Sequence, residues 1–119
     1  MLIHAVMDAI LGALCEGDIG QHFPDTDPMY KGISGMKLLS IVDKIMINKG
    51  FRVNNLDTII IAQEPKLSSY YQKMKKNLVS ALSVESNAVN IKATTTEGLG
   101  FTGRKEGIMA KAIVMLHKQ

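Results

Sequence analysis

The sequence predicts an α+β fold, an α/β two-layer sandwich of the ferredoxin-like kind with helices on one face of a mixed sheet. Three segments place apolar residues at a three- and four-residue spacing, as amphipathic helices do. Three other segments are rich in β-branched and aliphatic residues, as strands are. The order is helix, helix, strand, helix, strand, strand, and this interleaving favours two packed layers. At 119 residues we expect a single domain over residues 1–119.

The first helix is predicted over residues 2–15, and it ends before Gly17. A turn-rich loop with two prolines follows over residues 23–28. Ser34 is a suitable N-cap for a second helix that runs to about residue 48, and Gly50 stands where a C-terminal cap belongs.

The second half of the chain supplies the sheet. A strand over 51–62 is predicted from its β-branched run, and a helix follows over 68–82. Strands over 88–95 and 106–117 end the chain, and the last is apolar on both faces apart from Lys111, as in a central or interface strand. If the strands at 51–62 and 88–95 are parallel neighbours, the helix between them makes a right-handed crossover.

Composition excludes several classes of protein. The formal net charge is only +3 and the basic residues are spread out, so we expect no nucleic-acid partner. No apolar run is long enough to span a membrane, and residues 2–14 carry His4 and Asp8 without a basic leader, so we expect neither a membrane span nor a signal peptide. The single Cys15 excludes an internal disulfide, fits a reducing compartment and is predicted to be buried in its apolar helix.

The most informative segment runs from Lys92 to Arg104. Three consecutive threonines are followed by Glu97, three glycines and an arginine. Glycines let backbone amides approach a phosphate, and a lone carboxylate beside phosphates is a common Mg²⁺ ligand. The segment therefore indicates either a phosphate and metal site or a Thr-rich strand that ends in a Gly-rich turn.

Four further positions each have a functional and a plain structural interpretation. His4, one helical turn before Asp8, is either a core histidine or a metal ligand, but His22 and His117 stand at no obvious ligand spacing. Asp18 and Gly20 suit the hydroxyls of a ribose or polyol, or a simple turn. Asp25 and Asp27 are turn formers or ligands.

The segment from Ala62 to Ser68 follows the end of a predicted strand, an edge where α/β sheets bind ligands. Its backbone could read the edge of a planar base, with Lys66 near phosphate. These signals agree on a nucleotide-like ligand with a sugar, phosphates and a metal.

Five motifs together resemble the family of 2-C-methyl-D-erythritol 2,4-cyclodiphosphate synthase over the whole chain. They are His4-Ala5 with Asp8-Ala9, Gly17-Asp18-Ile19-Gly20, Phe23-Pro24-Asp25-Thr26-Asp27-Pro28, Ala62-Gln63 with Pro65-Lys66, and the segment from Asn90 to Ile108. The resemblance implies a lyase of non-mevalonate isoprenoid biosynthesis, in the bacterial cytoplasm or the plastid stroma. It would convert 4-diphosphocytidyl-2-C-methyl-D-erythritol 2-phosphate to the 2,4-cyclodiphosphate plus CMP.

The resemblance also implies roles for individual residues. His4 matches a zinc ligand, and the sugar hydroxyls would be held by Asp18, Ile19 and Gly20. The loop over the methylerythritol part would be Phe23, Pro24, Asp25, Thr26 and Asp27, and the cytidine pocket would be Ala62, Gln63, Glu64, Pro65, Lys66, Leu67 and Ser68. The diphosphate cradle would be Thr94, Thr95, Thr96 and Glu97, with Thr95 as a transition-state donor and Glu97 on Mg²⁺ or Mn²⁺. Phe101 and Arg104 match further substrate contacts.

Family resemblance further implies a homotrimer with active sites between adjacent subunits, the last strand lining the threefold axis. Arg104 and Glu106 resemble residues near a central cavity that can hold an isoprenoid diphosphate. One departure concerns zinc, because the family's Asp-x-His and His-Ser motifs are not found, which leaves one of three zinc ligands. We therefore expect an N-terminally truncated synthase. The alternatives are an inactive oligomer that binds cytidine nucleotides or isoprenoid diphosphates, and an unrelated ferredoxin-like sensor of small molecules.

Overall fold

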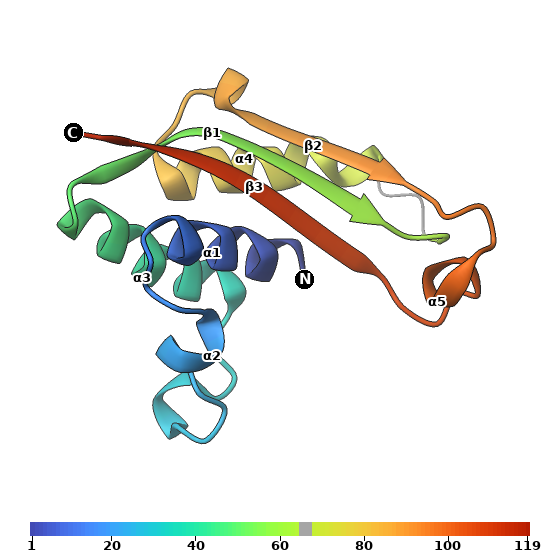
Figure 1. The fold of residues 1–119 in the computed structure, drawn as a ribbon, viewed down its shortest axis with the longest axis horizontal. Helices are drawn as coiled ribbons and strands as arrows, with labels where there is room; N and C mark the ends of the chain where they lie inside the picture. Colours follow the sequence, from blue (N-terminus) through green and yellow to red (C-terminus); the bar gives the residue numbers. More distant parts are fainter. Residues whose placement is uncertain (65–67) are drawn as a thin grey trace.

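The structure is a computed structural model that describes residues 1–64 and 68–119. The helices are α1 (Leu2–Ala13), α2 (Ile19–His22), α3 (Gly35–Asn48), α4 (Tyr71–Leu82) and α5 (Gly100–Gly103) (Figure 1). The strands are β1 (Phe51–Ile61), β2 (Val89–Thr94) and β3 (Met109–Lys118). Short 3₁₀ turns cover Pro28–Tyr30, Ser68–Tyr70 and Ser86–Ala88.

The three strands form one mixed sheet in the order β2-β1-β3. Strand β1 pairs in parallel with β2, from Leu56 opposite Val89 to Ile61 opposite Thr94. It pairs antiparallel with β3, with a register shift between Val53 and Asn55. The mixed sheet is as predicted, and the two strands that α4 connects are parallel neighbours, which is the condition for a crossover.

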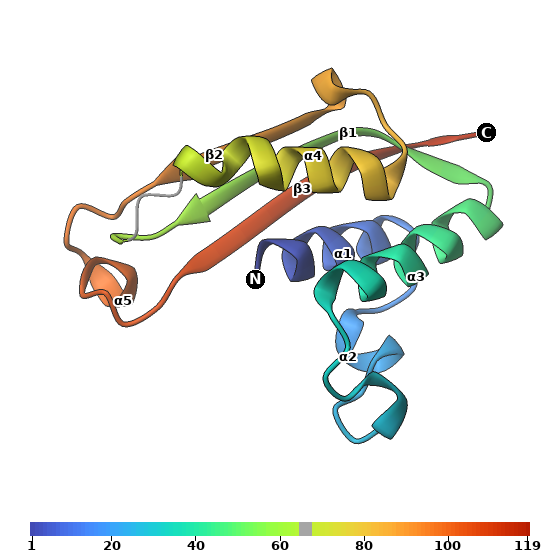
Figure 2. The same ribbon diagram turned by 180° about the vertical axis from the view of Figure 1, so that it is seen from behind.

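The hydrophobic core lies between the sheet and helices α1, α3 and α4. Its fully buried side chains come from all three helices and from β1 and β2, among them Met7, Leu11, Leu39, Met46, Leu56, Leu78, Leu82 and Val89. Figure 2 shows α4 in front of the strands, and Figure 1 shows the strands in front of α4. The predicted α+β class, with helices on one face, is confirmed.

The opposite face of the sheet carries apolar side chains in the open. Ile113 and Met115 of β3 are 76% and 62% exposed. Strand β3 is an edge of the sheet formed by the described residues, so the prediction that it could be a central strand is wrong for the single chain. The other prediction, an interface strand, fits this exposure pattern because both of these side chains need a partner to be buried.

Helix α1 ends earlier than predicted, in a Schellman motif. The amide of Cys15 donates to the carbonyl of Gly12 at 3.1 Å, and the amide of Glu16 donates to that of Leu11 at 2.9 Å. Cys15 takes a left-handed conformation with φ 57° and is exposed. The prediction of a buried Cys15 is therefore wrong, because the helix has already ended where its apolar face would have continued. No helix among the described residues is long and apolar enough to cross a membrane.

Candidate active site

The residues predicted for the site fall into two groups that lie at separate ends of the molecule (Figure 1). The first, the α2 group, comprises His4 and residues 18–20 and 23–27. The second, the α5 group, comprises residues 62–64, 94–97, 101 and 104. In the α2 group, His4 belongs to α1 and the other residues lie beyond α1 and α3, whereas the α5 group lies where β1 and β2 end. The chain extends 43 × 37 × 23 Å, and one copy does not bring the two groups together.

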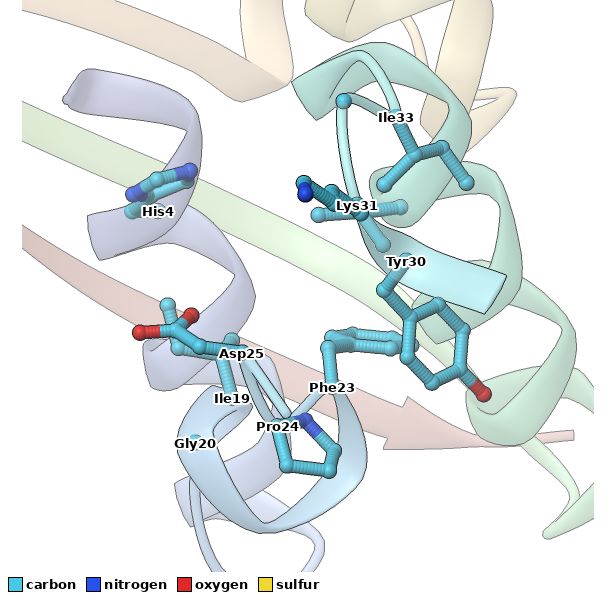
Figure 3. Close-up of a pocket in the computed structure, with 11 residues that line it drawn as sticks. His4, Ile19, Gly20, Phe23, Pro24, Asp25, Tyr30, Lys31 and Ile33 are labelled. Atoms are coloured by element: carbon cyan, nitrogen blue, oxygen red, sulfur yellow. The ribbon is translucent and has the colours of Figure 1, made fainter. Parts of the chain in front are cut away.

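A pocket of about 570 Å³ marks the α2 group (Figure 3). His4 reaches it from α1, and Ile19, Gly20 and Asp25 reach it from the segment that follows. Its remaining lining residues are Phe23, Pro24, Tyr30, Lys31, Gly32, Ile33 and Leu38. Four residues predicted to share a ligand therefore line one cavity, together with Phe23 and Pro24 from the same set. Tyr30 and Lys31 were not predicted, since they belong to no motif and to no periodic segment.

Two aspartates of the α2 group cap short helices. The side chain of Asp18 caps α2 by accepting a hydrogen bond from the amide of Gln21 at 2.9 Å. Asp27 caps the next 3₁₀ turn by accepting from the amide of Met29 at 2.9 Å. Both bonds use the Oδ1 atom. The turn-former interpretation therefore holds for both residues, and each keeps a second carboxylate oxygen for a ligand.

The loop of the α2 group is anchored by an aromatic contact. Phe23 is 9% exposed and meets Tyr30 edge to face, with the ring centroids 5.1 Å apart. Such pairs add to the energy of apolar burial. This contact fixes the start of the loop. Asp25 and Thr26, which follow Phe23, are exposed.

In the α5 group, the threonines fold the loop after β2 upon itself. The hydroxyl oxygen of Thr95 accepts from the amide of Glu97 at 3.1 Å. The Thr96 hydroxyl contacts the carbonyl of Leu99 and lies 2.9 Å from the Thr102 hydroxyl, which is almost completely buried. Glu97 is exposed and has a left-handed backbone with φ 54°. The loop thus presents the Glu97 carboxylate outward. Thr102 was not predicted, although it lies within the motif.

Glycine packing closes the same loop. A Cβ atom placed on Gly103 would lie 2.1 Å from the carbonyl carbon of Gly98. Only a residue without a side chain permits this approach of the two backbones. Phe101 precedes Gly103 in the sequence and Arg104 follows it, and both are exposed. Arg104 Nε donates to the Glu106 carboxylate at 2.6 Å.

The end of β1 is tied to this loop by three contacts. The amide of Ala62 donates to the carbonyl of Thr94 at 3.1 Å. The amide of Gly98 donates to Gln63 Oε1 at 3.2 Å, and Lys105 forms an ion pair with Glu64 at 3.2 Å. Parallel strands end at the same sheet edge, which is why these two segments meet. Pro65, Lys66 and Leu67 lie outside the described residues, and Ser68 begins a 3₁₀ turn.

The donor side chains of the described residues do not complete a zinc site. Protein zinc sites use at least three protein ligands. Among residues 1–64 and 68–119, no three His, Cys, Asp or Glu side chains gather closely enough to hold a metal ion. No hydrogen bond joins His4 to Asp8 within this part of the chain, and the Asp8 carboxylate accepts from the amide of Ile19 at 2.9 Å. The exposed Glu97, by contrast, fits Mg²⁺, which needs only one or two carboxylates when phosphates supply the other ligands.

The fold and the two groups define an α+β protein with polar loops at the ends of parallel strands and a separate pocket beside helix α1. The model of the YgbB family matches residues 1–117, and the chain belongs to this family.

The relatives agree with the family predicted from the motifs. The 2-C-methyl-D-erythritol 2,4-cyclodiphosphate synthase of Halothermothrix orenii is 60% identical over 116 residues, covering 98% of this chain and 70% of the relative. The synthase of the same name from Syntrophotalea carbinolica is 56% identical over 118 residues, covering 99% and 72%. The predicted resemblance to these synthases is confirmed.

Solved structures agree with the fold. The bifunctional IspDF from Campylobacter jejuni matches with a TM-score of 0.94 and 42% identity, covering 99% of this chain and 32% of that one. The IspF of Plasmodium falciparum, solved as a CDP complex, matches with a TM-score of 0.86 and 30% identity, covering 98% and 70%.

Proposed function

We propose that this protein converts 4-diphosphocytidyl-2-C-methyl-D-erythritol 2-phosphate to 2-C-methyl-D-erythritol 2,4-cyclodiphosphate with release of CMP. The observation that carries the proposal is the joined pair of loops at the ends of β1 and β2, where Gln63 meets Gly98 beside the threonines and Glu97. Membership of a family whose relatives bear this enzyme name supports it. A relative of known structure that holds CDP supports a cytidine nucleotide as the ligand.

The chemistry is an intramolecular transfer of a phosphoryl group. An oxygen of the 2-phosphate attacks the β-phosphorus, the new P–O bond closes the ring, and the bond from the β-phosphorus to the CMP oxygen breaks. Such a reaction requires the protein to position the groups and to neutralise phosphate charge. Thr95 suits the role of donor, because its oxygen already accepts from the Glu97 amide and its hydroxyl proton stays available to a phosphate oxygen.

The proposed reaction involves divalent metal ions. Glu97 would hold Mg²⁺ or Mn²⁺ between the phosphates, where the ion supplies positive charge that offsets the developing negative charge. His4 would be one zinc ligand. Because no three donor side chains gather among the described residues to complete a zinc site, the proposed reaction includes no step through zinc.

A complete site would combine two copies of the chain. The sugar-binding residues of the α2 group and the nucleotide-binding residues of the α5 group lie at separate ends of one copy, so a single substrate would need groups from two copies. We propose the homotrimer, with the exposed apolar face at Ile113 and Met115 turned toward the other subunits. Arg104 and Glu106 would then stand near a central cavity suited to an isoprenoid diphosphate.

One observation favours a second candidate function. The lack of a three-donor cluster for zinc within the described residues suits an inactive oligomer that binds a cytidine nucleotide or an isoprenoid diphosphate. It would keep the α5 group and release no CMP.

The experiment is a turnover assay on the assembled protein with the diphosphocytidyl substrate, zinc and magnesium. Release of CMP that Glu97→Gln abolishes while the fold stays intact is the expected result. Glu85→Gln is the matched control, since Glu85 is exposed and makes no side-chain capping bond. Binding of CMP with Mg²⁺ but no release of CMP would favour the second candidate. Failure to bind either CMP or an isoprenoid diphosphate would contradict both.

A further inference from the structure

We infer that Asp8 is a positioning residue for the sugar-binding segment, fixing Asp18, Ile19 and Gly20 against helix α1. Its carboxylate Oδ1 accepts a hydrogen bond from the amide of Ile19 at 2.9 Å, across eleven residues of sequence. The importance of this contact for ligand binding rests on the proposed function, whereas the contact itself does not.

The Ile19 amide needs such a partner. Ile19 is the first residue of α2, and the first amides of a helix have no carbonyl to donate to within that helix. Asp18 meets the same need for Gln21 at 2.9 Å. Two carboxylates therefore hold the amides on either side of Gly20, but only Asp8 comes from outside the segment. Among the hydrogen bonds of the described residues, the bond to Asp8 attaches this segment to α1, in addition to the apolar packing of Ile19 and Phe23 against the core.

Asp8 lies close to the pocket because of its position on α1. His4 stands one helical turn before Asp8 on the same face, and His4 lines the same cavity as Ile19 and Gly20 (Figure 3). Fixing Ile19 to Asp8 therefore fixes the spacing between the imidazole of His4 and the residues proposed to hold the sugar. A shift of this segment would change the distance between the imidazole of His4 and the sugar-binding residues, and so the way in which one ligand contacts them.

Other contacts shape the segment without attaching it to α1 itself. His22 Nε2 lies 2.6 Å from the Glu16 carbonyl, and Glu16 forms an ion pair with Lys49 of the turn after α3. These contacts keep the loop closed when Asp8 is lost. Asp8 is exposed, whereas the buried side chains of α1 are those of Leu2, Val6, Met7, Ile10 and Leu11. Removing the Asp8 carboxylate therefore leaves the core unchanged.

The test compares Asp8→Ala with Asp8→Asn, because the asparagine keeps an acceptor oxygen in the same place. Glu85→Ala removes a carboxylate that makes no capping bond and serves as the control. The first readout is hydrogen exchange of the Ile19 amide by NMR in the ligand-free protein. The second is the affinity of the assembled protein for 2-C-methyl-D-erythritol 2,4-cyclodiphosphate and, separately, for CMP.

We expect Asp8→Ala to speed exchange at Ile19 by about 10-fold and to weaken binding of the cyclodiphosphate by about 10-fold, the scale of one charge-assisted hydrogen bond. CMP affinity should not change, because CMP would bind the α5 group. Asp8→Asn should stay within about 3-fold of wild type in both readouts.

Unchanged exchange and unchanged cyclodiphosphate affinity in Asp8→Ala would overturn the inference. So would an Asp8→Asn variant as defective as Asp8→Ala, because the acceptor would then not be what matters. If the wild-type protein binds neither ligand, the proposed function fails. In that case the exchange rate at Ile19 still decides whether Asp8 holds the segment.

Discussion

The side-chain oxygen of Gln63 accepts a hydrogen bond from the backbone amide of Gly98 at 3.2 Å. This bond joins the end of β1 to the turn after β2, and the ion pair of Glu64 with Lys105 joins the same two segments at 3.2 Å. The segment proposed to bind cytidine and the segment proposed to hold phosphate are therefore fixed to each other. One ligand that touches both would meet a preformed arrangement.

Loss of the Gln63 side chain should separate the two segments. We expect Gln63→Ala to weaken CMP binding by about 5-fold, since one hydrogen bond contributes about 1 kcal/mol. Binding is measured by titration calorimetry. Gln72→Ala on α4 is the matched control, because Gln72 is exposed. CMP affinity equal to that of wild type would show that the bond does not organise the site.

Gly103 should tolerate no side chain. In Gly103→Ala the new Cβ would lie 2.1 Å from the Gly98 carbonyl carbon, so the loop must open. We expect a free energy of unfolding lower by about 1–3 kcal/mol, together with weaker CMP binding. Gly12→Ala is the control, because nothing lies within 4 Å of a Cβ there and its helical position favours alanine by about 1 kcal/mol. Denaturant unfolding measures the free energy of unfolding of both variants. A destabilised Gly12→Ala or an unaffected Gly103→Ala would contradict the geometry.

Ionisation of the Asp43 carboxyl should lower the free energy of unfolding as the pH rises. Burial raises the pKa of its carboxyl above the 3.8 of an unfolded aspartate, although Arg52 nearby opposes this shift. The folded state then holds the proton more tightly, so this contribution to stability falls from about pH 3.8 up through the folded pKa. Asp43→Asn removes the titration, and its free energy of unfolding relative to wild type should rise over that window.

The control for Asp43 has the opposite sign. The hydrogen bond from Lys92, at 2.7 Å, and one from Asn90 lower the pKa of Asp57 below 3.8. Its stabilisation is present above pH 3.8 and is lost as the pH falls through the folded pKa. Asp57→Asn should therefore lose stability relative to wild type as the pH rises through that lower window. Urea unfolding between pH 3 and pH 7 measures the free energy of unfolding of both variants relative to wild type. If this difference changes with pH in the same direction for both variants, the two pKa shifts are not as described.

The exposed Cys15 should react in the native protein. Its thiol stands after the end of α1 and is open to solvent. We expect one thiol per chain to react with a thiol reagent such as dithionitrobenzoate without denaturant, and Cys15→Ser to abolish the signal. Reaction only after unfolding would mean that the buried position first predicted from the sequence is right after all.

The sequence was sufficient for the long elements because their apolar patterns are periodic. Residues 35–48 and 51–61 agree with prediction to within one residue at each end. The four-residue helices α2 and α5 were missed, since one turn is too short to show a period. Cys15 was placed wrongly because the Schellman motif that ends α1 uses a cysteine where glycine is usual.

The motifs predicted the residues of the candidate site but could not show their contacts. That Asp18 caps a helix, and that Gln63 reaches Gly98, depends on distances between segments far apart in sequence. The roles of Thr102 and Gly103 likewise come from tertiary packing within the loop. A motif shows which residues occur together, whereas burial and hydrogen bonds show which of them shape the loop and which face outward.

The central claim is that one site combines the α2 group of one copy with the α5 group of another. Its most direct test mixes Asp18→Ala with Glu97→Gln, each inactive alone, after unfolding and reassembly in equal amounts, and measures CMP release. Random assembly gives a site with both halves intact in about a quarter of cases, so we expect about a quarter of wild-type turnover. A mixture as inactive as its two components would show that each site is built within a single chain.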